Sequence, residues 1–163
     1  MESQKGITIG LIFGPIINLL SCAILEILVF GFYGGIISAI LNFDFEIYFW
    51  AVSISILPTV FLFMWFGHRL SKKEMSKKQV WLYSAMAGFV VIFISASIGN
   101  GVYSYFNSTS SLSEHVTIIV AMFKYAPVYA LTLIPFTTPM CVLALKILSK
   151  IITSTIKTRT SIN

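Results

Sequence analysis

Four long apolar stretches decide what this chain can fold into. They cover residues 7–41, 45–66, 80–102 and 116–148. Each reaches the roughly 20 residues that an α-helix needs to cross a bilayer core of about 30 Å. Only 10% of the residues are charged, whereas soluble domains typically carry about 25%, so most of the surface must face lipid. We therefore expect an all-α integral membrane protein, a bundle of four transmembrane helices that forms a single membrane domain.

The first and last stretches are longer than one crossing requires. They contain 35 and 33 residues, which is too short for two crossings with a polar turn between them. We expect the surplus to lie in the outer leaflet, with the surplus of the last stretch at residues 116–123. The predicted spans are 7–30 with an outer-leaflet extension to residue 41, 45–66, 80–102 and 125–148.

The basic residues predict the orientation of these spans. Ten of the eleven Lys and Arg residues lie near the N-terminus, in the loop 67–79 and near the C-terminus. The other two connections, one of which is the outer loop 103–115, hold Asp44, Glu46 and Glu114 but no Lys or Arg. Loops rich in Lys and Arg stay on the cytoplasmic side. We therefore expect both termini and the basic loop 67–79 to be cytoplasmic.

Glu26 and Lys124 are the charged residues that lie well inside the apolar stretches. A charge at the centre of a membrane helix costs about 2.5–3.5 kcal/mol and raises a functional hypothesis. Counting the helical rise back from the cytoplasmic ends places both residues at a similar depth near the outer face. Two interpretations stand: an ion pair that ties span one to span four, or a proton or cation site at Glu26.

Small residues recur at a spacing of four in spans one and three. This spacing places them on one helix face, where another backbone can approach closely. We expect the faces to hold the bundle together, and docking of a second copy or of a membrane-protein partner is the alternative. The residues are Gly6, Gly10 and Gly14 in span one, and Ser84, Gly88, Ser95 and Gly99 in span three.

Three prolines, Pro127, Pro135 and Pro139, predict a kinked fourth span. Proline frees backbone carbonyls, and neighbouring threonine hydroxyls can satisfy the freed groups in a membrane helix. Kinked helices line pores and gates, but they also occur in ordinary bundles. The prolines therefore predict a shape and not a function.

Catalytic and cofactor motifs are missing from the sequence. It has no phosphate-binding loop, no H-E-x-x-H, no pair of carboxylates within a span and no nucleophile elbow. Cys22 and Cys141 lie in apolar stretches without a C-x-x-C, which argues against a disulfide framework or a zinc site. We expect a protein that is not an enzyme, holds no cofactor or metal and does not bind nucleic acid directly.

In overall layout the chain resembles small immunity and exclusion proteins of the bacterial inner membrane. These are the four-span immunity proteins against pore-forming colicins and the superinfection-exclusion proteins of temperate phages. The shared features are small size, basic cytoplasmic loops, an apolar outer-leaflet surface and the lack of a catalytic motif. The segment TTPMCVLALKILSK, residues 137–150, is similar to the Thr-Pro and basic end of the last span in colicin immunity proteins. The spacing differs, so no functional residue is carried over.

The resemblance implies a protein that protects its host cell by blocking an incoming agent, such as phage DNA with its ejection proteins, a pore-forming toxin or a conjugating plasmid. Recognition would take place within the bilayer, at the outer-leaflet segments 31–41 and 116–123, with the small-residue faces allowing close packing. Substitutions such as Gly10→Leu or Gly88→Leu would then abolish protection and leave membrane insertion intact.

Two alternative functions remain open at the level of sequence. The first is a small oligomeric transporter or channel that uses Glu26, because small multidrug transporters also carry a single glutamate in span one. The second is an accessory subunit of a larger membrane complex.

Overall fold

The computed structural model describes residues 2–99, 102 and 112–160, and these residues are helical apart from the connections at residues 35, 42–44 and 73–76. Four helical segments are long and apolar enough to cross a membrane: Ser3–Val29, Phe45–Lys72, Lys77–Gly99 and Val116–Thr155. The predicted all-α class is thereby confirmed, and the four apolar helices fit a multi-pass membrane protein. Most of the predicted outer loop, residues 103–111, lies outside the described residues. The elements are α1 (Glu2–Gly34), α2 (Ile36–Leu41), α3 (Phe45–Lys72), α4 (Lys77–Ile94), the π-helix η1 (Ser95–Gly99) and α6 (Leu112–Thr160).

Local sequence signals explain where the helices begin and end. Gly35 separates α1 from α2 with a φ of 85°, a left-handed conformation that glycine adopts without steric cost. Asp44 caps α3, because its carboxylate accepts hydrogen bonds from the backbone N–H groups of Glu46 and Ile47 at 2.9 and 3.1 Å. Ser76 starts α4 in a reciprocal capping box with Gln79.

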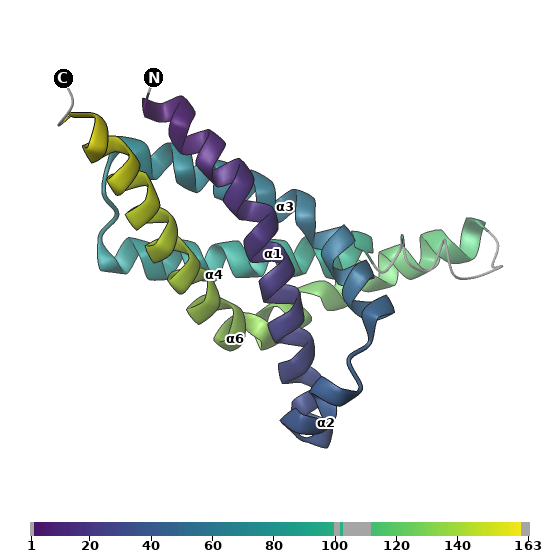
Figure 1. Ribbon diagram of the computed structural model, residues 1–163. Coiled ribbons are helices and arrows are strands. Elements are labelled where there is room, and N and C mark those ends of the chain that lie inside the picture. Colours follow the sequence, from purple (N-terminus) through teal and green to yellow (C-terminus); the bar gives the residue numbers. More distant parts are fainter. Residues whose placement is uncertain (1, 100–101, 103–111, 161–163) are drawn as a thin grey trace.

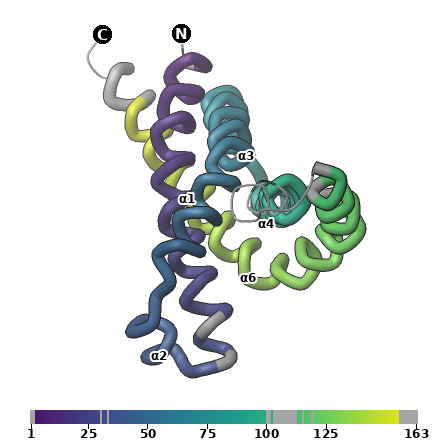
Figure 2. The backbone as a smooth tube through the Cα atoms, turned by 90° about the vertical axis from the view of Figure 1, so that its right-hand side faces the viewer, coloured from purple at the N-terminus to yellow at the C-terminus, as the bar shows by residue number. Residues whose placement is uncertain are grey.

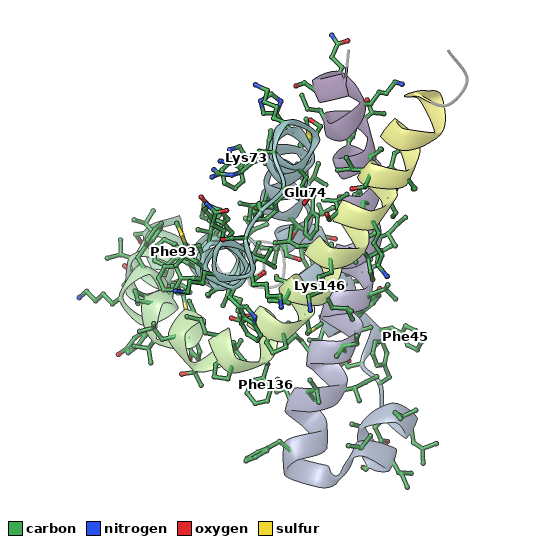
Figure 3. The ribbon with its side chains drawn as sticks, turned by 90° about the vertical axis from the view of Figure 1, so that its left-hand side faces the viewer. Phe45, Lys73, Glu74, Phe93, Phe136 and Lys146 are labelled. Atoms are coloured by element: carbon green, nitrogen blue, oxygen red, sulfur yellow. The ribbon has the colours of Figure 1, made fainter. Side chains whose placement is uncertain are left out.

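The helices form two pairs that pack crosswise. Helices α1 and α3 run antiparallel and side by side, and α4 lies beside the first half of α6 (Figures 1 and 2). The second pair crosses the first, so the bundle is not a parallel array of four spans (Figure 2). Phe93 of α4 lies toward the first half of α6 (Figure 3), where its ring meets Phe123 edge-on at 6.1 Å.

Helix α6 bends strongly between its first and second halves (Figure 2). Pro127, Pro135 and Pro139 lie inside this helix, and each removes one backbone hydrogen bond. Thr132 and Thr137 donate their hydroxyl hydrogens to the carbonyls of Val128 and Leu133, at 2.9 and 3.0 Å. The apolar segment 116–123, predicted as outer-leaflet material before a separate span, is thus the beginning of one continuous helix of 49 residues.

The basic segments lie on one side of the molecule. The beginning of α1, the α3–α4 connection and the end of α6 gather at the upper left of Figure 1, whereas α2 and the beginning of α6 lie below and to the right. The first group carries most of the Lys and Arg residues. The segments predicted to share one face of the membrane therefore share one side of the structure.

The buried core is close to the basic side. It joins the end of α3 to α4 and to the second half of α6, and α1 covers it with Ile9, Phe13 and Ile17. Helix α2 and the first half of α6 contribute no residue to this cluster. Its members are Phe63, Phe66, Ala87, Ala144, Leu145, Leu148 and Ile152.

The glycines of span one lie against the backbone of α3. A Cβ atom at Gly6 or Gly10 would come closer than 3.0 Å to the carbonyl groups of Gly67 or Phe63, and one at Gly14 would come to 3.0 Å from Val60 Cα. The first small-residue face is therefore occupied within the chain and is not free for an incoming helix.

The small residues of span three are also packed internally. A Cβ atom at Gly88 would lie 2.6 Å from Thr137 Oγ1, and one at Gly99 would meet the side chain of Ile54. Ser84 is fully buried, and the Ser95 hydroxyl oxygen is buried as well.

Replacing Gly10 by alanine tests this close contact. We expect Gly10→Ala to lower the free energy of unfolding by about 2 kcal/mol, because the new methyl group meets backbone that cannot move aside. Gly34→Ala is the matched control, because its Cβ would lie 3.7 Å from Ser38 Oγ, an ordinary contact. Both variants are unfolded in mixed micelles with a rising fraction of denaturing detergent. Circular dichroism monitors the loss of helix and gives the free energy of unfolding of each variant. Equal stability of the two variants would contradict the contact.

Candidate functional site

The face of α1 that carries the glycines continues with polar residues at the same spacing. Asn18, Cys22 and Glu26 follow Gly14 at intervals of four residues, and all three bond to α3 or to the residue that caps it. Sequence reasoning missed Asn18 and treated Cys22 only as a residue of an apolar stretch. The uninterrupted spacing of four from Gly6 to Glu26 is the signal that would have found them.

Asn18 is the centre of a buried hydrogen-bonded cluster. Its side chain is 3% exposed. Its Oδ1 accepts hydrogen bonds from the hydroxyls of Ser55 and Thr59 at 2.9 and 3.0 Å, and its Nδ2 donates to the carbonyl of Val52 at 3.1 Å. Cys22 Sγ lies 3.4 Å from Ser55 Oγ. Within lipid a buried polar group needs such partners, so this cluster fixes the register of α1 on α3.

Glu26 and Lys124 are not brought together by the fold. Glu26 is buried, and its Oε1 accepts a hydrogen bond from the backbone N–H of Asp44 at 2.8 Å. Lys124 is exposed on the first half of α6, which lies away from the end of α1 in both ribbon and tube views (Figures 1 and 2). No ion pair joins them in the part of the chain that the structure describes, and Glu26 instead holds the α2–α3 connection against α1.

A cavity of about 590 Å³ lies between the two helix pairs, beside the Asn18 cluster. Its wall is built by α1, α3, the α4–η1 segment and the part of α6 that contains the bend. Most of the wall is aliphatic or aromatic, and both cysteines of the chain, Cys22 and Cys141, line it. The polar side chains on the wall include Asn18, Ser21, Ser55, Thr59, Ser95 and Thr137.

The chemistry of the cavity is that of neutral hydrogen-bonding groups. None of the described residues that line it is charged, and neither Glu26 nor Lys124 is among them. Within the described ranges no group of three His, Cys, Asp or Glu side chains could hold a metal ion. The arrangement is suited to apolar, uncharged molecules or side chains, because an ion would lose its hydration without gaining a partner.

A double-mutant cycle tests the Asn18 cluster. Asn18→Ala removes the acceptor of two hydroxyls, so we expect a loss of stability of about 1–3 kcal/mol. Thr59→Val removes one of these hydroxyls with little change of shape. The coupling between the two changes should lie between about 0.6 and about 1.7 kcal/mol, the average and the maximum for hydrogen bonds between membrane helices. The control is Ser53→Ala, because Ser53 is exposed and bonds to Phe49 of its own helix. Strictly additive effects of the changes at Asn18 and Thr59 would refute the hydrogen bond between their side chains.

Amide hydrogen exchange tests what Glu26 binds. In Glu26→Gln the side-chain amide oxygen can still accept from the Asp44 N–H, so exchange at Asp44 should stay close to the wild-type rate. In Glu26→Ala we expect it to rise by about two- to tenfold, as the loss of one hydrogen bond predicts. Lys124→Met should leave the rate unchanged. Faster exchange in Lys124→Met would indicate an ion pair with Glu26 after all.

Comparison with known proteins yields no relative: no family model, no curated protein and no solved structure matches this chain.

Proposed function

We propose that this chain is a non-enzymatic protein of the bacterial inner membrane that confers exclusion or immunity on its host cell. It blocks the entry or action of an incoming agent, which is phage DNA with its ejection proteins, a pore-forming toxin or a conjugating plasmid. Both termini lie in the cytoplasm, in keeping with the basic segments that gather on one side of the molecule. The partner is a membrane helix of the intruder.

The observation that carries this proposal is the set of exposed apolar side chains on α2 and on the beginning of α6, two segments that lie away from the basic side (Figure 1). The large side chains of α2 are exposed, with Ile37 at 77% and Leu41 at 78%. Val116, Val120 and Phe123 at the beginning of α6 are exposed as well. These side chains stay outside the buried core, so they are available to an incoming helix in the outer leaflet.

The proposed recognition surface is narrower than the sequence suggested. The glycines of α1 are in contact with the backbone of α3, and Gly88 faces Thr137. These positions support the fold, and recognition is left to α2 and residues 116–123. Loss of protection in Gly10→Leu or Gly88→Leu would therefore report misfolding.

Transport through Glu26 has no support in this geometry. Glu26 does not line the cavity, and its carboxylate accepts the Asp44 N–H. Protection of a host cell is accordingly the function we test first, and flux is the alternative outcome.

A challenge assay tests the proposal. The protein is expressed in a susceptible bacterium, which is then exposed to temperate phages, pore-forming colicins and conjugating donors. We expect protection against one of these classes with adsorption to the cell surface unchanged. Full sensitivity to every member of the panel, with the protein present in the inner membrane, would refute the proposal.

Paired alanine variants test the recognition surface. Ile37→Ala combined with Leu41→Ala should reduce protection by about tenfold or more, because truncating a hot-spot contact costs about 2 kcal/mol. Leu57→Ala combined with Phe61→Ala, on α3, removes apolar side chains of similar exposure, 66% and 67%, and should leave protection unchanged. Plating efficiency or colicin survival is compared at equal amounts of protein in the membrane fraction. An equal loss in both pairs would argue against a specific role of α2.

A further inference from the structure

The cavity between the two helix pairs points to a ligand. We propose that it binds an uncharged, membrane-soluble molecule with a long apolar body and one hydrogen-bond acceptor, such as a carbonyl oxygen. This inference does not rest on the proposed function, because the cavity is lined by neither Glu26 nor the exposed side chains of α2.

The size and the lining of the cavity set the class of ligand. Its volume of about 590 Å³ falls within the range of about 300–1,000 Å³ that is typical of small-molecule sites. Side chains such as Ile17, Leu62, Val91 and Leu133, from four helical segments, form most of the wall. A charged ligand would find no counter-ion among the described lining residues, so the ligand must be neutral.

The hydrogen bonds of Asn18 indicate what the ligand must carry. The carboxamide oxygen is already the acceptor for the hydroxyls of Ser55 and Thr59. The carboxamide nitrogen has two hydrogens, and one of them goes to the Val52 carbonyl. The second hydrogen has no acceptor among the described residues, although Asn18 is 3% exposed and lines the cavity. The wall therefore offers a donor at this point, and the matching ligand group is an acceptor.

Ser95 supplies a second polar group on another wall of the cavity. Its hydroxyl oxygen is buried and has no hydrogen-bond partner in the described part of the chain. Ser95 is the first residue of η1, and π-helical turns inside helices are frequent at functional sites. Buried polar groups are almost always hydrogen-bonded. The unpartnered Ser95 hydroxyl and the second N–H of the Asn18 carboxamide, on the wall of one apolar cavity, favour a ligand that is more than a hydrocarbon chain.

Photolabelling with two matched probes tests the proposal. The full-length protein in lipid nanodiscs is irradiated with a long-chain methyl ketone that carries a diazirine in its chain, or with the alkyl diazirine that lacks the carbonyl. Labelled residues are identified by mass spectrometry. We expect the ketone to label the cavity wall on at least two helices about fivefold more than the alkane does, the ratio expected for about one hydrogen bond. Excess unlabelled ketone should suppress this labelling.

Two variants separate binding from folding. Asn18→Leu removes the donor but also disturbs the α1–α3 contact. Ser95→Ala removes a hydroxyl that makes no hydrogen bond within the described residues, so it should fold normally and lower ketone labelling by about two- to threefold. Ser53→Ala, on the exposed side of α3, should label as the wild type does.

Three results would overturn the proposal. Equal labelling of the cavity by the ketone and the alkane would mean that lipid acyl chains fill it. Labelling that excess ketone does not suppress, or that falls outside the cavity wall, would mean that no site exists. If Ser95→Ala and Asn18→Leu both fold and are labelled as strongly as the wild type, then neither Ser95 nor Asn18 contributes to ligand binding.

Discussion

The rest of the structure depends on the contact between α1 and α3. Helices in lipid gain nothing from hiding apolar side chains from one another, so they associate through close packing and interhelical hydrogen bonds. One face of α1 uses both means in succession. Near the basic side, Gly6 and Gly10 let the backbone of α3 approach, and farther along Asn18 and Glu26 provide hydrogen bonds. Because both sets follow the same spacing of four residues, a single register satisfies them together.

The bend of α6 explains how α4 and α6 pack against the α1–α3 pair. The first half of α6 packs beside α4, where Phe93 meets Phe123. The second half turns back to bury Leu145 and Leu148 against Phe63 and its neighbours. A straight helix could not reach both places. The same bend holds the α4 pair at an angle to the α1–α3 pair (Figure 2), and the cavity lies where the two pairs diverge.

The class of protein and the positions of its apolar helices could be predicted from sequence, because length and apolarity alone decide whether a helix can cross a bilayer. Which helices pack against one another could not be predicted from the sequence. Glycine spacing marks a face but does not say which helix meets it, and here the partner is Gly67, outside any motif. The buried Glu26 suggested a basic partner, yet it bonds to a backbone N–H at Asp44. Backbone donors have no signature in a sequence, and only the path of the chain places them.

Large buried side chains are unevenly distributed between the basic side of the molecule and the side opposite to it, and this bears on where the proposed partner would act. The large buried side chains, Phe63, Phe66, Leu145, Leu148 and Ile152, gather near the basic side. On the opposite side the buried apolar residues of α2 and early α6 are small, Ala39, Ala126 and Ala130. Regions with few buried apolar contacts open and shift at lower cost than the core. In the proposed function, α2 and the beginning of α6 would therefore adjust to an incoming helix at lower cost than the glycine contact and the core, which keep the bundle intact.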